Sequence, residues 1–146
     1  MKLLNFLDDK AYEIDRIRIY DYFLLFPFEL NKITMPIGFF EYKKIAKENR
    51  FNKIHDVRNI FLQLEGVQEL AFNAMISYGF LSKDFYLDGN IKIDISLIPS
   101  DLSLTLNDIE RTYMEFVTKC FEKMSLRELK ERTKLMEYRY ELSEIK

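Results

Sequence analysis

The sequence has few of the residues that disulfide frameworks and metal centres need. Among its 146 residues, Cys120 is the single cysteine and His55 the single histidine. One cysteine cannot form a disulfide within the chain, and this usage is typical of a reducing compartment. Zinc sites and other centres that need two histidines, or several Cys and His ligands, cannot be built from one copy. We therefore expect a cytoplasmic protein that is not a metalloenzyme.

Motifs that carry common enzyme chemistry are also missing. No G-x-x-x-x-G-K-[ST], G-x-G-x-x-G or G-x-S-x-G pattern occurs, which excludes the common phosphate-binding loops and the hydrolase nucleophile elbow. Cys120 falls on an apolar helical stripe, where a cysteine usually acts as a small buried hydrophobe. His55 lies in a predicted loop, where a surface or capping role is the simplest interpretation. We predict no catalytic residue and no bound cofactor.

Long hydrophobic runs are absent. The strongest apolar stretch, residues 22–28, is interrupted by Pro27 and is far shorter than the roughly 20 residues of a membrane-spanning helix. The first nine residues reach two aspartates before a signal-peptide core can form. With only 4 Gly and 3 Pro but 13 Phe and 9 Tyr, the composition instead predicts a packed globule. We expect no membrane contact.

Hydrophobic spacing divides the chain into an α+β domain and a helical region. Residues 12–26 are predicted to form a helix that stops at Pro27, and residues 39–50 a second helix. Between residues 57 and 78 apolar positions recur every three or four residues, and Gly66 is predicted to split this stretch into two helices, with Gly79 as a left-handed C-cap. Residues 85–87 and 91–97, joined at Asp88-Gly89-Asn90, predict a β-hairpin.

Three helices followed by a hairpin predict a winged-helix-like domain over residues 10–99. Residues 100–146 are expected to be a C-terminal helical region that packs on this domain or on a partner. Two N-terminal helix signals support it, since Ser125 precedes Glu128 by three residues and Asn107 precedes Glu110 in the same way. We expect the apolar stripes of these helices to need a surface to cover them.

The charge distribution argues against base reading by the expected third helix. Residues 67–78 contain one acid and no cation, whereas a helix in the DNA major groove presents Arg, Lys, Asn or Gln to the base edges. The overall charge of −2 gives no attraction to phosphates either. The clearly basic stretch lies earlier, and its candidate nucleic-acid contacts are Lys43, Lys44, Lys47 and Arg50. A solvated helix face explains this stretch about as well.

Five residues are candidates for contact with a protein partner. Phe72 and Ile76 lie on the same helix, which has no cation, where they indicate either a contact face or ordinary core. Arg16, Arg18 and Asp21 lie on the first helix. Pairing within that helix is the alternative for the charged residues, since Arg18 is three residues from both Asp15 and Asp21.

Three blocks of the sequence resemble a known family. They are RIRIYDYFLLFP from Arg16 to Pro27, FLQLEGVQ from Phe61 to Gln68, and GFL from Gly79 to Leu81. Together they resemble the middle component of bacterial ABC-three-component systems, which overlap with Lamassu-type defence systems. The family's usual small residue or proline after the Phe-x-Gln-Leu block is Gly66 in this chain. The resemblance covers roughly residues 10–100 and carries no catalytic residues with it.

The resemblance implies a small winged-helix-like subunit that joins an SMC- or Rad50-like ABC ATPase to a larger effector, often a nuclease, in defence against phage or plasmids. In such a complex DNA is contacted mainly through the other subunits. The alternative is a winged-helix DNA-binding regulator that uses the basic segment at residues 43–58 and dimerises through its last helices. Salt-dependent binding of the isolated protein to duplex DNA would favour the regulator.

Overall fold

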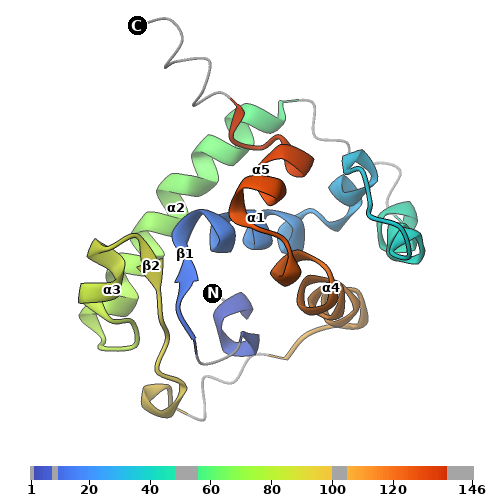
Figure 1. Cartoon of the computed structure of the whole chain (residues 1–146). Helices are drawn as coiled ribbons and strands as arrows, with labels where there is room; N and C mark the ends of the chain where they lie inside the picture. The colour runs from blue at the N-terminus through green and yellow to red at the C-terminus, as the bar shows by residue number, and fades with distance from the viewer. Residues whose placement is uncertain (1, 8–9, 49–55, 100–104, 138–146) are drawn as a thin grey trace, which may run out of the picture.

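The computed structural model describes residues 2–7, 10–48, 56–99 and 105–137, and its fold is mostly helical with one small antiparallel sheet. This confirms the predicted α+β class. Figure 1 shows helix α1 in the middle of the molecule, with α2 along one side and α4 and α5 along the other. The α-helices are α1 (Ile14–Leu25), α2 (Val57–Ser77), α3 (Lys83–Leu87), α4 (Asp108–Lys119) and α5 (Leu126–Thr133). Short 3-10 helices are η1 (Lys2–Phe6), η2 (Pro27–Lys32), η3 (Phe40–Glu48), η4 (Ile95–Leu97) and η6 (Phe121–Lys123).

Helix α1 is the centre of the core, as its apolar second half predicts. Ile17, Ile19, Tyr20, Tyr22 and Phe23 are all nearly or fully buried. The helix ends where Pro27 requires, because that residue has no backbone N–H to continue the ladder and instead begins η2. The predicted first helix is therefore confirmed to within two residues at each end.

The C-terminal helices cover one side of α1. The Tyr113 hydroxyl on α4 donates a buried hydrogen bond of 2.8 Å to the backbone carbonyl of Tyr20. Phe121, just after α4, lies with its ring centroid 6.0 Å from that of Tyr20 and 4.7 Å from that of Phe116. One buried cluster thus takes side chains from both sides of residue 100. The apolar stripes predicted for these helices find their covering surface within the chain.

Both predicted helix starts in this region are confirmed. The Asn107 side chain accepts from the Glu110 amide at 2.8 Å, and the Glu110 carboxylate accepts from the Asn107 amide at 3.2 Å. This is a complete capping box, in which two otherwise unsatisfied amides are paired reciprocally. Ser125 Oγ accepts from the Glu128 amide at 3.1 Å and caps α5. Polar pairs spaced by three residues therefore fix where α4 and α5 begin.

The predicted break at Gly66 is wrong, because α2 runs without interruption from Val57 to Ser77. Gly66 does not adopt a positive φ, and a helix of 21 residues tolerates one glycine at a cost of roughly 1 kcal/mol. The predicted C-cap is confirmed. Gly79 has φ of +81°, and its amide and that of Phe80 donate to the carbonyls of Ile76 and Met75 in a Schellman arrangement.

Replacing Gly66 by alanine tests whether α2 is continuous. An added Cβ meets no atom within 4 Å, and alanine lowers the entropy of the unfolded chain. We expect Gly66→Ala to raise the free energy of unfolding by about 0.5 to 1 kcal/mol in urea titrations. A loss of stability would instead show that residue 66 is a bend between two helices.

The predicted β-hairpin is also wrong, although its turn is present. Lys83–Leu87 forms helix α3, which begins after Ser82 because the Ser82 hydroxyl accepts from the Phe85 amide. Gly89 has φ of +86° in the expected turn, but the strand that follows it, β2 (Asn90–Ile91), pairs with β1 (Tyr12–Glu13). The winged-helix arrangement is therefore not confirmed.

A second, shorter pairing holds the end of α2 to the sheet. Leu81 and Ile93 form an antiparallel bridge, the Ser82 amide donates to the Lys92 carbonyl at 3.3 Å, and the Asp94 amide donates to the Phe80 carbonyl at 3.1 Å. Leu81 and Ile93 are 4% and 3% exposed, so they face the core. Since successive residues of extended backbone point to opposite faces, their neighbours face outward.

Candidate partner-binding surface

Helix α2 is held to the core by a narrow set of side chains. Phe61, Gln68 and Phe72, spaced by seven and four residues, are the buried positions among its 21 residues. The Phe61 ring meets Tyr22 of α1 edge-on at 5.8 Å between centroids, and the Phe72 ring lies 6.1 Å from that of Tyr86. The rest of the circumference of α2 is exposed or half-buried.

A polar pair fixes the middle of α2 on α1. The Gln68 side-chain amide donates to the Asp21 carboxylate at 2.8 Å and lies 3.5 Å from the Arg18 carbonyl. Burial raises the pKa of Asp21, and the hydrogen bond from Gln68 opposes that rise. The Gln68 side-chain oxygen is buried without a hydrogen-bond partner among the described residues. Asp21 thus helps to position α2, but its carboxylate loses part of its hydration in doing so.

The sign of the Asp21 shift gives a pH-dependent prediction. A carboxyl whose folded pKa is raised binds its proton more tightly in the folded state, so the protein loses stability as pH rises through the interval between the unfolded and folded pKa values. Asn at this position keeps a hydrogen bond to Gln68 without the charge. We expect the stability of Asp21→Asn relative to the natural chain to increase from pH 4 to pH 7 in urea titrations. A constant difference would show that Asp21 is not desolvated.

The outward side of α2 carries large apolar side chains in water. Val67 is 62% exposed, Leu70 73% and Tyr78, at the C-cap, 74%. With the exposed Ala74 they recur every three or four residues and therefore lie on one face. We call these four residues the α2 strip. A cluster of exposed apolar side chains on one helix is typical of a protein-binding surface.

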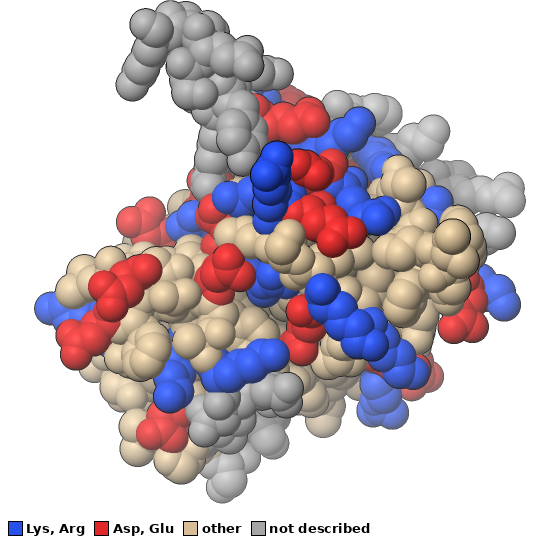
Figure 2. All heavy atoms as spheres, in the orientation of Figure 1, with Lys and Arg blue, Asp and Glu red and all other residues tan. Residues whose placement is uncertain are grey.

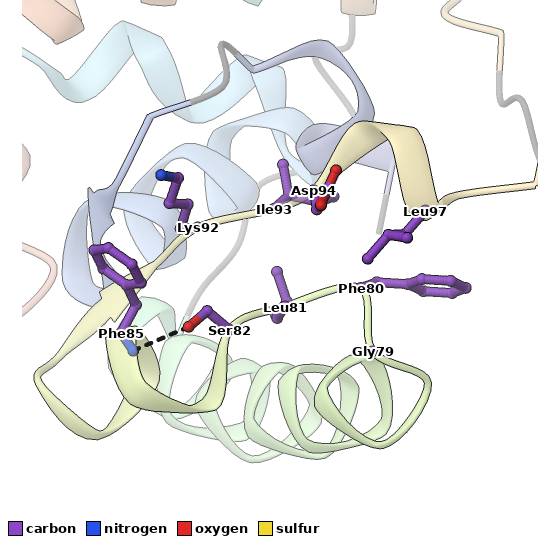
Figure 3. Close-up of a pocket in the computed structure, with 9 residues that line it drawn as sticks. All are labelled: Gly79, Phe80, Leu81, Ser82, Phe85, Lys92, Ile93, Asp94 and Leu97. Atoms are coloured by element: carbon purple, nitrogen blue, oxygen red, sulfur yellow. Dashed lines mark hydrogen bonds between the residues drawn. The ribbon is translucent and has the colours of Figure 1, made fainter.

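A groove adjoins the C-terminal end of the strip (Figure 3). Its volume is about 420 Å³, and its nine lining residues are Gly79, Phe80, Leu81, Ser82, Phe85, Lys92, Ile93, Asp94 and Leu97. The Tyr78 ring of the strip stacks on the Phe80 ring of the groove at 5.9 Å between centroids. The strip and the groove therefore form one continuous surface.

The candidate contact residues named from the sequence lie mostly inside the fold. Arg16 is 8% exposed and Phe72 is fully buried, whereas Ile76 is half-buried. Arg18 forms an ion pair with Asp15 at 3.5 Å, as the alternative interpretation predicts. The Asp21 carboxylate accepts a hydrogen bond from Gln68. A direct role for these five residues with a partner stays a prediction. The exposed apolar residues that sequence reasoning missed, Val67 and Leu70, are on the same helix as Phe72.

Arg16 connects α1 to the segment between α4 and α5. Its guanidinium donates to the carbonyls of Phe121 at 2.9 Å and Met124 at 2.7 Å, to the Tyr20 hydroxyl at 3.1 Å and to Glu13 at 3.1 Å. Burial raises the pKa of Tyr20 to about 12, so its phenol stays protonated at neutral pH. The guanidinium of Arg16 therefore makes its hydrogen bonds to groups of its own chain.

The basic segment is described only in part. Lys43 is half-buried and Lys44 exposed on η3, which packs on α4 through the rings of Tyr42 and Phe116 at 5.1 Å between centroids. The side chain of Lys47 and the whole of Arg50 and His55 lie outside the described residues. On the face visible in Figure 2, Lys and Arg are interspersed with Asp and Glu, so no positive field covers it. A nucleic-acid role for this segment stays a prediction.

Within the described ranges, no group of three or more His, Cys, Asp or Glu side chains is arranged to hold a metal ion. In the same ranges no helix has both the length and the apolar character needed to cross a membrane. Cys120 is 3% exposed, and burial raises the pKa of its thiol. Its position is that of a core side chain.

Comparison with known proteins gives one family. A family model described as ABC-three component (ABC-3C) system Middle Component 5 matches residues 1–141. No curated protein and no solved structure matches the chain.

Proposed function

This chain belongs to the Middle Component 5 family of ABC-three-component systems, and from that premise we propose that it is a non-enzymatic adaptor between the other two components. One of these is an ABC ATPase of the SMC or Rad50 type, and the other is a larger effector, in the proposal a nuclease. The complex acts in Lamassu-like defence against phage or plasmids. DNA is sensed by the ATPase, and this subunit transmits the outcome to the effector.

The observation that carries the proposal is the exposed α2 strip. A helix whose apolar side chains are 62% to 74% exposed gains free energy when another surface removes them from water, by roughly 25 cal/mol for each Å² of apolar area. The strip lies on the opposite side of α2 from Phe61, Gln68 and Phe72, which anchor the helix on the core. A partner can therefore dock without any rearrangement of the fold.

The fold also supports a subunit that keeps its shape as partners bind. The Arg16 contacts and the Tyr113 hydrogen bond join the C-terminal region to α1. Helix α2 lies on α1 as well, so α1 stands between the exposed strip and α4 and α5 (Figure 1). A subunit bound on the strip would therefore be held in a fixed orientation relative to α4 and α5.

A capture experiment with three purified components tests the adaptor function. Immobilised ATPase from the same gene cluster is incubated with the effector, with and without this chain. We expect the effector to be retained only when this chain is present. Retention of the effector at the same level without this chain would overturn the proposal, as would failure of this chain to bind either component.

A further inference from the structure

We propose that the groove at Phe80, Ser82, Phe85, Lys92, Asp94 and Leu97 binds an extended segment of a partner subunit that carries an acidic residue two positions from a large apolar residue. This inference rests on the proposed adaptor function and adds the chemistry of the segment that is recognised. The groove is formed by the residues around the bridge between Leu81 and Ile93.

The backbone pairing places four side chains on the outer face. Because Leu81 and Ile93 point to the core, their neighbours Phe80, Ser82, Lys92 and Asp94 point outward. The hydrogen bonds between the two segments place Ser82 opposite Lys92, and Phe80 opposite Asp94. Figure 3 shows Phe85 and Lys92 at one end of the groove and Phe80 and Leu97 at the other. The groove therefore has a basic side chain at one end and apolar side chains at the other.

The Lys92 end supplies a positive charge. Its ammonium nitrogen lies 5.3 Å from the centroid of the Phe85 ring. Among the residues that the structure describes, it has no carboxylate partner. A cation–π contact at a partly exposed site is worth roughly 0.5 to 1 kcal/mol and leaves the charge of the ammonium intact. A carboxylate from an incoming segment is the group that matches it.

The other end supplies an apolar wall. Leu97 is 54% exposed, and Phe80 is half-buried with its ring stacked on Tyr78 of the α2 strip. Asp94, opposite Phe80, accepts hydrogen bonds from the amide and hydroxyl of Ser96, with the amide at 3.1 Å. These bonds hold the Asp94 carboxylate within its own loop, away from the charge of Lys92. An aromatic or long aliphatic side chain fits against Phe80 and Leu97.

The distance between Lys92 and the apolar end sets the sequence pattern of the occupant. Position 94 lies opposite Phe80 of the apolar end, and positions 92 and 94 are about 6.6 Å apart along the extended backbone. An extended segment lying beside them presents its own side chains to the groove at the same interval. The matching pattern is acidic–any–apolar, or its reverse, and the volume of about 420 Å³ admits a short stretch of this kind.

Selection from a random peptide library, with the full chain as bait, tests the proposal. We expect enriched peptides to carry Asp or Glu two residues from Phe, Tyr, Leu or Ile. The Lys92→Glu variant should select Lys or Arg at that position instead and weaken the best acidic peptide about five- to tenfold in fluorescence polarisation. Lys83→Glu, an exposed lysine on α3 outside the groove lining, is the matched control and should leave the selection unchanged.

Two results would overturn the inference. One is an acidic preference that survives Lys92→Glu, and the other is a selection in which no peptide is enriched over a Leu97→Asp bait. In either case the three-component capture experiment still reports on the adaptor function. Retained bridging together with a failed selection would remove the groove assignment alone, whereas loss of bridging would remove the proposed function itself.

Discussion

Replacing Arg16 by methionine is expected to lower the free energy of unfolding by about 3 kcal/mol, a large effect for a polar side chain. Methionine fills much of the same volume but donates no hydrogen bond. The carbonyls of Phe121 and Met124, both in buried residues, then lose a charged donor at 2.9 and 2.7 Å. The Phe121 carbonyl keeps the hydrogen bond from the Met124 amide at 3.1 Å, whereas the Met124 carbonyl loses the charged donor. An orphaned buried acceptor costs about 1 to 3 kcal/mol, and a lost hydrogen bond from a charged donor about 1.5 to 3 kcal/mol. Urea titration with an unchanged slope measures the loss.

An exposed arginine provides the control for this substitution. Arg127 on α5 has a side chain that is 89% exposed and pairs with Glu131 at 3.2 Å. Such surface pairs contribute little, so Arg127→Met should change stability by less than about 0.5 kcal/mol. Equal losses in the two variants would contradict the role assigned to Arg16.

The second large effect is on binding. Introducing aspartate at both Val67 and Leu70 should abolish capture of the partner that docks on α2, with at least a 100-fold loss of affinity. Both side chains are more than 60% exposed, so the folded monomer accepts the change. In the complex the two carboxylates would be buried in an apolar contact without partners, at a cost of several kcal/mol. Surface plasmon resonance against each of the other two components measures the loss.

Asn73→Asp is the matched control for the strip. It adds a charge to an exposed position of α2 that is outside the strip, three residues from Leu70. Circular dichroism and urea titration of both variants establish that the fold is intact. If the control loses binding as strongly as the double variant, the net charge of the helix decides the interaction and the apolar strip does not.

Several helix ends could be predicted from the sequence because local signals decide them. Pro27 fixes the end of α1, the Asn107–Glu110 and Ser125–Glu128 pairs fix the starts of α4 and α5, and Gly79 fixes the end of α2. Each signal acts through backbone groups within a few residues, so no knowledge of the tertiary fold is needed.

The break at Gly66 and the β-hairpin were wrongly predicted because local sequence signals do not determine these two features. Gly66 is compatible with a bend, but the contacts of Phe61, Gln68 and Phe72 on either side of it favour one straight helix. The alternating stretch after Gly89 does contain a strand, yet its partner is β1, far away in the sequence. Ser82 meanwhile starts a helical turn where a strand was expected.

The sequence places the apolar residues of this stretch on one helix but does not show which of them are exposed. The lack of cations in residues 67–78 favours a protein contact over a DNA contact, but periodicity alone does not show which apolar side faces α1. The predicted contact residue Phe72 is therefore buried, whereas Val67 and Leu70 on the same helix are exposed. Arg16 illustrates the same limit, because its acceptors Phe121 and Met124 lie more than 100 residues away in the chain.

Site-specific photo-crosslinking tests most directly whether this subunit binds a partner through the α2 strip. Benzoylphenylalanine is placed at Leu70 of the α2 strip or, as a control, at Glu131 on the exposed side of α5, and each variant is irradiated with the other two components. We expect a crosslink from position 70 to the ATPase or the effector, with markedly less from position 131. Crosslinking from position 131 with none from position 70 would contradict it.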